Sequence, residues 1–278
     1  MEGRKTMRSF FTVVLIGVIL SFPAFVQAQF RAEELAQREA FEKYLLQAKI
    51  IGHERIGEGV TKPRLLQLEL DGKILKGCWK NPTGSDLGFR EKWKYEIAAY
   101  KLDKYLKVNM VPPTVERRFR GRSGSLQLWI PDLTNELKIR KEGLSVPEGN
   151  RDHLEKILCL ARAFDSLIGN IDRTQQNQNY TSDWRLILID HSRAFRYKKF
   201  YIEQLLYGKN GMRKGLLFDR LPRIFVERVQ TLDEPLLRKI AGPYLNGEEI
   251  KAVLKRKVLL LREIDEMIAE RGESAVLY

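Results

Sequence analysis

The sequence predicts an α+β protein of two lobes, with a small antiparallel β-rich N-terminal lobe that contains one helix and a larger helical C-terminal lobe. Residues 50–130 contain short runs of alternating apolar residues separated by strong turn signals, which is typical of antiparallel strands. From residue 151 onward, apolar residues recur mostly at helical spacing. The length of 278 residues is enough for one large domain or two lobes, and the hydrophobic fraction of 44% predicts a real core.

The N-terminus predicts a secretory signal peptide over residues 1–28. Arg4, Lys5 and Arg8 form a basic start, residues 10–25 are almost wholly apolar, and small residues suited to cleavage follow. An uncleaved anchor is the alternative, although the apolar run is slightly short for a full membrane span. Either way we expect the body of the protein to be exported, to a periplasm, the extracellular space or a secretory lumen. Membrane contact is expected only through an uncleaved segment.

The N-terminal lobe is predicted over residues 53–131 and is preceded by a helix within residues 29–52, where apolar residues recur at helical spacing. Asp71-Gly72 is a strong hairpin turn, and the strand after it is predicted over residues 73–80. A loop rich in Gly and Asp then leads to a helix over about residues 90–106. An extended arm and a second hairpin complete the lobe.

The C-terminal lobe is predicted over residues 132–278. Residues 151–168 carry an apolar helical stripe, and Asn150 is in position to cap that helix. The last helix is predicted to start at Asn246, with Glu249 three residues later as its capping-box partner. Shorter helical patches are predicted between these two long helices.

Charge and cysteine content limit the partners and the kind of site. The net charge is +13, and without the signal segment, whose net charge is +2, it is +11. This excess favours anionic partners such as phosphates, acidic proteins, glycans or lipid head groups. No nucleic-acid-binding motif accompanies it, so nucleic acid is not expected.

The two cysteines, Cys78 and Cys159, fall in a predicted strand and on the apolar side of a predicted helix. A disulfide is the alternative in an exported chain, but a chain of this size does not need one, so we expect two buried free thiols. The three scattered histidines make no metal-ligand cluster with them.

The stretch between residues 169 and 190 is the most informative about function. Asp172 and Asn177 have four residues between them, and Asp190 ends an aliphatic run. This is the layout of a phosphoryl-transfer site, in which one carboxylate orients the attacking hydroxyl while an amide oxygen and a second carboxylate hold Mg²⁺. An Asn-rich turn is the plain alternative. That alternative does not explain the aspartate that ends the aliphatic run, so we expect a nucleotide-dependent phosphotransferase.

Two residues of the N-terminal lobe are candidates to complete such a site. Lys76 and Lys80 lie four apart and share one face of the predicted strand. We favour Lys80 as the phosphate-binding lysine because the small Cys78 beside it leaves room for a flat base. Glu96, on the predicted helix, is next to small alanines and is the expected partner of the lysine. Solvent-facing lysines and a solvated glutamate are the plain alternatives.

These pieces resemble the atypical protein-kinase-like enzymes, which include the phosphatidylinositol 3-/4-kinase-like group, actin-fragmin kinase, HipA-type kinases and the secretory-pathway casein kinases. The resemblance covers roughly residues 55–270 and is most specific over residues 165–195. The shared pieces are Glu96 in Glu-x-Ala-Ala-Tyr, the arm 111–115, Gly124-Ser125-Leu126-Gln127, Asp165-x-Leu-Ile-Gly-Asn-x-Asp-Arg through Asn177, and 189–195.

The resemblance implies roles for individual residues. Asp172 would be the catalytic aspartate, and Asn177 and Asp190 would hold Mg²⁺, or Mn²⁺ in its place. Lys80, oriented by Glu96, would hold the α- and β-phosphates of ATP.

The remaining nucleotide contacts are expected from a sparse glycine loop and from the junction between the lobes. Gly57, Gly59 and Thr61 lie just before a predicted strand, where glycines let the backbone approach phosphates. Plain turn glycines are the alternative. Trp129, at the junction, is the fourth expected nucleotide contact.

The predicted function is therefore an exported ATP- and Mg²⁺-dependent kinase that acts on a hydroxyl of a protein or small molecule. Thr174 stands where many relatives have histidine, and Asp190 is followed by His191-Ser192 rather than Phe-Gly. Basic residues 193–199 would suit an acidic peptide, a phosphorylated sugar or a lipid head group as the acceptor, and a solvated basic loop is the plain alternative. Because ATP is scarce outside the cytoplasm, a non-catalytic, pseudokinase-type module that binds a nucleotide or partner is the alternative. A basic glycan- or membrane-binding protein without a nucleotide site is a third.

Overall fold

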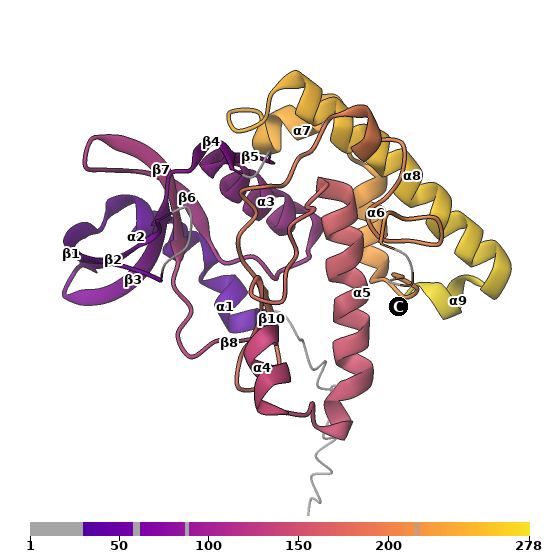
Figure 1. The fold of residues 1–278 in the computed structure, drawn as a ribbon, viewed down its shortest axis with the longest axis horizontal. Helices are drawn as coiled ribbons and strands as arrows, with labels where there is room; N and C mark the ends of the chain where they lie inside the picture. The colour runs from indigo at the N-terminus through magenta and orange to yellow at the C-terminus, as the bar shows by residue number, and fades with distance from the viewer. Residues whose placement is uncertain (1–29, 58–61, 87–88, 214, 216) are drawn as a thin grey trace, which may run out of the picture.

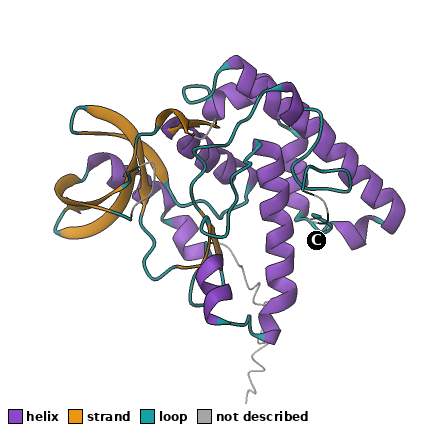
Figure 2. Ribbon diagram, in the orientation of Figure 1, coloured by secondary structure: helices purple, strands orange, loops and turns teal. Residues whose placement is uncertain are grey.

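Five antiparallel strands form a sheet on one side of the molecule, and helices make up most of the rest (Figures 1 and 2). The computed structural model describes residues 30–57, 62–86, 89–213, 215 and 217–278. The strand order is β1-β2-β3-β7-β6. The strands are β1 (Lys49–Arg55), β2 (Arg64–Leu70), β3 (Lys73–Lys80), β6 (Thr114–Phe119) and β7 (Arg122–Leu128). Both predicted hairpins are present, as β2–β3 and β6–β7.

One face of the sheet packs on the helix α2 (Arg38–Gln47), and the short helix α1 (Ala32–Ala36) precedes and contacts α2. The core between them is apolar and includes Tyr44, Leu45, Leu66, Leu68, Trp79, Leu126 and Leu128. Because side chains alternate along a strand, the opposite face of β3 carries Cys78 and Lys80. The sheet begins at Lys49, inside the range predicted for the N-terminal helix.

Gly124 lets β7 approach β3 closely beside Lys80. A Cβ atom at this position would lie 2.5 Å from the Lys80 carbonyl oxygen and 2.7 Å from the Trp79 ring. Neither neighbour can move easily, because one is backbone and the other is packed in the core. A glycine here thus fixes the strand that carries Lys80.

A small hairpin precedes the helix of the N-terminal lobe, where the sequence predicted a loop. It consists of β4 (Thr83–Asp86) and β5 (Phe89–Lys92), and α3 (Trp93–Leu106) follows directly. The predicted start of the helix near residue 90 was three residues early, because residues 90–92 pair with β4 instead of entering the helix. The buried side of α3 joins the core of the helical lobe.

The C-terminal lobe contains a three-stranded sheet with the order β10-β9-β8 and is otherwise mostly helical. Its strands are β8 (Thr134–Asn135), β9 (Gln178–Tyr180) and β10 (Leu186–Leu188). The α-helices are α4 (Glu136–Glu142), α5 (Arg151–Ile168), α6 (Arg223–Gln230), α7 (Glu234–Ala241), α8 (Gly247–Arg271) and α9 (Glu273–Val276). Single 3-10 turns occur at η1 (Glu148–Asn150) and η2 (Lys199–Tyr201). The long helices α5 and α8 pack against each other in this lobe (Figure 1).

The two helix-cap predictions had different outcomes. Asn246 and Glu249 form the predicted capping box at the start of α8, each side chain accepting from the backbone N–H of the other residue. Asn150 makes no cap hydrogen bond, so that prediction was wrong. The residue has helical backbone angles (φ −101°, ψ −6°) because it ends the turn η1, which continues into α5.

The expectations about export and cysteines rest on different parts of the chain. The predicted signal segment 1–28 lies outside the described residues. Among the described residues, none of the helices is long and apolar enough to cross a membrane. Cys78 and Cys159 are both free thiols; Cys159 is buried, as expected, whereas Cys78 is only half-buried.

Candidate active site

The catalytic-loop candidate follows α5, which ends in a left-handed glycine. Gly169 (φ 62°) closes the helix, and a Cβ atom there would lie 2.8 Å from the guanidinium carbon of the buried Arg256. Glycine is favoured on both grounds, the positive φ and the close approach. The turn directs the chain into residues 170–177, which carry Asp172.

Arg173 holds this loop in shape from inside the protein. Its Nε and Nη2 donate to the two carboxylate oxygens of Asp165 on α5, at 2.9 and 3.0 Å. Its Nη1 donates to the carbonyls of Asn177 and Ile189, at 2.9 and 2.8 Å, and Nη2 lies 2.9 Å from His191 Nε2. All five N–H groups of the guanidinium are therefore used. The side chains of Arg173 and Asp165 are only 2% and 1% exposed.

Two side-chain amides complete the loop. Asn170 donates from Nδ2 to Asp165 at 2.9 Å, and its Oδ1 accepts from the Asp172 backbone N–H at 3.3 Å. Asn177 donates from Nδ2 to the Asp172 carbonyl at 2.9 Å. Because the nitrogen of the Asn177 amide is committed to the loop, its oxygen is the atom that remains as an acceptor for a ligand.

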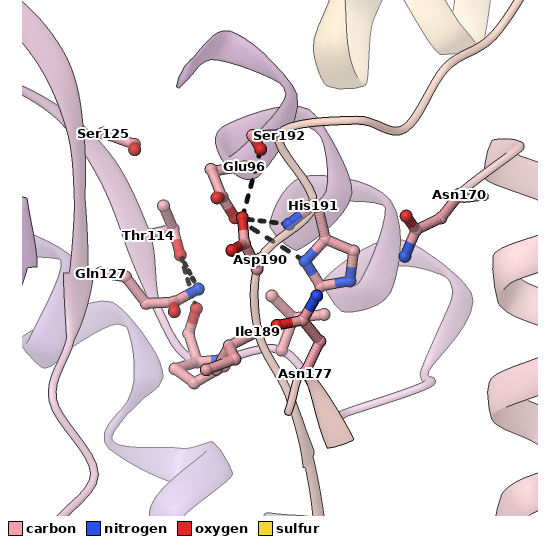
Figure 3. A network of polar contacts seen from close by, with 12 residues as sticks. Glu96, Thr114, Ser125, Gln127, Asn170, Asn177, Ile189, Asp190, His191 and Ser192 are labelled. Carbon is pink, nitrogen blue, oxygen red and sulfur yellow. Dashed lines mark hydrogen bonds and ion pairs between the residues drawn. The ribbon is translucent and has the colours of Figure 1, made fainter. Parts of the chain in front are cut away.

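Asp190 follows β10 in a left-handed conformation (φ 58°). This is an uncommon backbone for a residue other than glycine, and such positions are concentrated at functional sites. The Asp190 carboxylate accepts a hydrogen bond from Ser192 Oγ at 3.2 Å (Figure 3). It also lies 3.2 Å from Lys80 Nζ. Asp190 and Lys80 therefore join the two lobes at this point.

Lys80 lies between two carboxylates. Its Nζ is 3.3 Å from Glu96 Oε1 on α3, in addition to Asp190. Burial opposes the charge on Lys80, but the carboxylates of Asp190 and Glu96 outweigh it and raise the pKa of the lysine. Lys80 is thus a permanent cation. Lys76, the alternative on the same face of β3, is exposed.

Glu96 is held on its other side by His191. The other carboxylate oxygen of Glu96, Oε2, accepts from the His191 backbone N–H at 3.0 Å, and His191 Nδ1 lies 3.8 Å away (Figure 3). Burial works against the Glu96 carboxylate, but Lys80 and then His191 outweigh it and keep its pKa well below the usual range.

The His191 ring is fully buried, and burial lowers its pKa. Arg173 can only donate, so Nε2 of the neutral ring accepts and Nδ1 carries the proton. That proton faces Glu96. His191 therefore connects Glu96 to Arg173, two residues that the sequence analysis did not connect.

The Asp172 side chain is 30% exposed and has a basic neighbour. Arg193 Nη1 lies 3.6 Å from Asp172 Oδ2, and Arg193 Nε donates to Glu91 at 2.7 Å. Burial raises the pKa of Asp172, Arg193 lowers it in part, and Asp190 raises it further. An aspartate with a raised pKa suits a group that orients or accepts the proton of a hydroxyl.

The donor set fits Mg²⁺. This ion takes oxygen ligands and usually keeps waters and substrate phosphates as the remaining ones. Asn177 and Asp190 offer one amide oxygen and one carboxylate. Among the described residues there is no group of three or more His, Cys, Asp or Glu that could hold a metal ion. Waters and nucleotide phosphates would therefore have to supply the remaining ligands of Mg²⁺.

The predicted nucleotide contacts are only partly described. Gly57 (φ 57°) is exposed before β2, whereas Gly59 and Thr61 lie outside the described residues. Trp129 follows β7, is 38% exposed, and donates its backbone N–H to the Lys76 carbonyl. Gln127 pairs with Cys78 across the strands, and its side chain donates to Thr114 Oγ1 at 3.0 Å (Figure 3).

A second contact between the lobes was missed by the sequence analysis. Lys92 Nζ and Tyr95 Oη both donate to Glu249 Oε1, at 2.6 and 2.5 Å. Glu249 is fully buried, and its Oε2 accepts from the Asn246 N–H as part of the capping box. This contact, which we call the α3–α8 latch, ties the helix that carries Glu96 to the C-terminal lobe. The only signal for it was a capping-box glutamate at a buried position of the helix.

Comparison with known proteins places this site in a known fold. No protein-family model and no curated protein matches the sequence. A solved structure of hydra Fam20 with sugar matches with a TM-score of 0.61 at 16% identity, over 90% of this chain and 93% of that one. The Helicobacter pylori proinflammatory kinase CtkA matches with a TM-score of 0.51 at 10% identity, over 82% and 96%. The chain therefore has the two-lobed fold of atypical protein-kinase-like proteins, as its sequence predicted.

Proposed function

We propose that this protein is an exported kinase that uses ATP and Mg²⁺ to phosphorylate a hydroxyl of a protein or small-molecule acceptor. The observation that carries the proposal is the position of Lys80, within 3.3 Å of Glu96 and 3.2 Å of Asp190. In kinases, a lysine of the small lobe held by a helix glutamate contacts the nucleotide phosphates. The fold similarity to two kinases supports this reading.

Each residue has a distinct role in the proposed reaction. Lys80 neutralises charge on the nucleotide phosphates, and Glu96 keeps its ammonium group in place. Asn177 and Asp190 supply the oxygens that hold Mg²⁺, which neutralises the developing charge of the transferring phosphoryl group when bound. Asp172 orients the acceptor hydroxyl and takes its proton. Catalysis comes from positioning and charge stabilisation.

The surroundings of Asp172 favour an anionic acceptor. Arg193 is 3.6 Å from its carboxylate and also donates to Glu91 of β5 at 2.7 Å. A cavity of about 570 Å³ at β5 is lined in part by Arg90 and Lys92. Arg90 donates to the Tyr197 hydroxyl at 2.9 Å, so β5 is linked to the basic segment 193–199. An acidic peptide, a phosphorylated sugar or a lipid head group carries suitable charge. The hydra Fam20 structure was solved with sugar.

The experiment is a thermal shift with Mg²⁺-ATP, followed by a turnover assay on the same sample. Asp190→Ala is compared with Asp265→Asn, which removes the charge of an exposed aspartate on α8 that is not one of the proposed site residues. We expect wild type and Asp265→Asn to be stabilised and active, and Asp190→Ala to lose at least about 100-fold in turnover.

Two other outcomes reject the proposal. Stabilisation of the wild type without turnover would instead support a non-catalytic nucleotide-binding module. No stabilisation at all would leave a basic protein without a nucleotide site.

A further inference from the structure

A second cavity, of about 640 Å³, lies between α4, α5 and the β9–β10 hairpin. Its size is that of a site for a small organic molecule. One wall is apolar and is formed by Ile139, Leu154 and Leu158. Tyr180 and Trp184 add an aromatic wall, with ring centroids 5.9 Å apart. We call this cavity the α4–α5 pocket.

The α4–α5 pocket has an excess of positive charge. Of its four arginines, Arg140 pairs with Glu136 at 2.7 Å and Arg173 pairs with Asp165. These pairs use both acids of the lining. The other two, Arg162 and Arg213, form no ion pair with any residue that the structure describes.

Arg213 contacts a buried tyrosine of the pocket lining. Arg213 Nη1 donates to Tyr207 Oη at 3.0 Å, and the guanidinium lies over the Tyr207 ring, 5.4 Å from its centroid. Burial and Asp165 raise the pKa of Tyr207, whereas Arg213, Arg173 and Arg162 lower it in part. Arg162 and Arg213 both line the pocket, and Arg213 is in direct contact with Tyr207.

Most N–H donors of the Arg162 guanidinium make no hydrogen bond with the part of the chain that the structure describes. Within the described chain its guanidinium donates one hydrogen bond, from Nη1 to the Leu217 carbonyl at 2.7 Å. A guanidinium has five N–H donors, in a fork that matches a carboxylate or phosphate. A half-buried arginine without a counter-ion, facing an apolar and aromatic cavity, is suited to an anion with an apolar body.

We propose that the α4–α5 pocket binds a small organic anion, with its carboxylate or phosphate on Arg162 and Arg213 and its apolar body against Leu158 and Trp184. This site is separate from the one around Lys80, and the inference does not depend on the proposed kinase activity.

The pocket is in contact with the catalytic-loop candidate. Arg213 Nη2 donates to the Ile171 carbonyl at 2.8 Å and Nη1 to the Arg173 carbonyl at 3.3 Å. These two carbonyls flank Asp172. An anion bound to Arg213 therefore competes with these carbonyls for the guanidinium, or reorients it. Binding in the pocket would in this way change the position of the loop that carries Asp172.

The test is calorimetric titration of the full chain with phenylphosphonate, without Mg²⁺ and nucleotide. This probe combines a phosphate-like anion with one apolar ring and has no phosphoryl group that the protein could transfer. Arg162→Met is compared with Arg151→Met, which removes an exposed arginine from the same helix. Arg213→Lys is the second variant, and thermal unfolding checks that each variant folds.

We expect the wild type, Arg151→Met and Lys80→Met to bind alike. Arg162→Met and Arg213→Lys should bind at least about tenfold more weakly, because a charge-assisted hydrogen-bonding fork is lost. The Trp184 fluorescence should change on binding, and Trp184→Phe should remove that part of the signal. Absence of binding, equal binding by the Arg162 and Arg151 variants, or loss of binding in Lys80→Met would overturn the proposal.

Discussion

Arg173 shows how a single residue organises the candidate site. Its five donors bind α5, both ends of the loop hairpin and the His191 ring. Because the pair with Asp165 is buried, replacing either partner leaves an uncompensated charge inside the protein. Asp172 therefore owes its position to a neighbour that takes no part in the proposed chemistry.

Asp172 and Arg193 give a pH prediction. Protonated Asp172 cannot accept a proton, so turnover should fall as the pH drops through its pKa. Burial raises this pKa, and Arg193 partly lowers it. The variant Arg193→Met lacks the positive charge that lowers the Asp172 pKa, so this pKa rises further. The acid limb of the kcat/KM profile for Mg²⁺-ATP turnover should therefore move to higher pH.

The matched control is Lys199→Met, an exposed cation of the same segment. Its acid limb should coincide with that of the wild type. A shift to lower pH in Arg193→Met, or equal shifts in both variants, would contradict the assignment of Asp172 as the base.

At the scale of elements, the α3–α8 latch fixes the helix that carries Glu96. Lys92 and Tyr95 hold Glu249 from the N-terminal lobe, and Tyr95 is the direct neighbour of Glu96. Burial and the hydrogen bond to Glu249 raise the pKa of Tyr95, so its hydroxyl stays a donor. The latch thus keeps Glu96 in reach of Lys80.

Glu249→Gln should weaken the latch. The amide nitrogen of glutamine cannot accept from the Asn246 N–H, and the half-buried Lys92 loses its counter-charge. We expect the free energy of unfolding in urea to drop by about 2–4 kcal/mol. Mg²⁺-ATP turnover should fall as well, because α3 is released.

Glu248→Gln, one residue earlier and exposed, provides the comparison. It should change stability by less than about 0.5 kcal/mol. Equal effects of the two substitutions would show that the latch contributes nothing specific.

The sequence predicted elements better than their contacts. Asp172, Asn177 and Asp190 could be proposed together from the sequence because they lie within twenty residues and flank recognisable structure. The capping box of α8 was local in the same way. Asn150 failed as a cap because the preceding turn had already made it helical. No spacing rule could connect Glu96 to His191 or Tyr95 to Glu249, since each pair is separated by more than ninety residues.

At the level of the molecule, α3 belongs to the N-terminal lobe by sequence and contacts β6 and β7, but it shares the core of the C-terminal lobe. Its buried residues, among them Ala98, Ala99 and Leu102, are part of the same core as Leu160 and Phe164 of α5. The sheet has a separate, smaller core with α2. The described residues therefore form two cores, and their boundary does not follow the boundary between the lobes.

Native-state hydrogen exchange should show this division. We expect the amides of α3 to be protected to the same free energy of opening as those of α5, and the edge strand β1 to open at lower free energy. Exchange of α3 together with β1, while α5 stays protected, would be inconsistent with a shared core.

The most direct test of the central claim is the Mg²⁺-dependent turnover of γ-labelled ATP by Lys80→Met and Lys76→Met. The two lysines share one strand face, but only Lys80 lies within 3.3 Å of Glu96 and 3.2 Å of Asp190. If Lys80 binds the nucleotide phosphates, Lys80→Met should lose at least about 100-fold in turnover, whereas Lys76→Met should stay within about twofold of the wild type. Equal turnover by the two variants would contradict it.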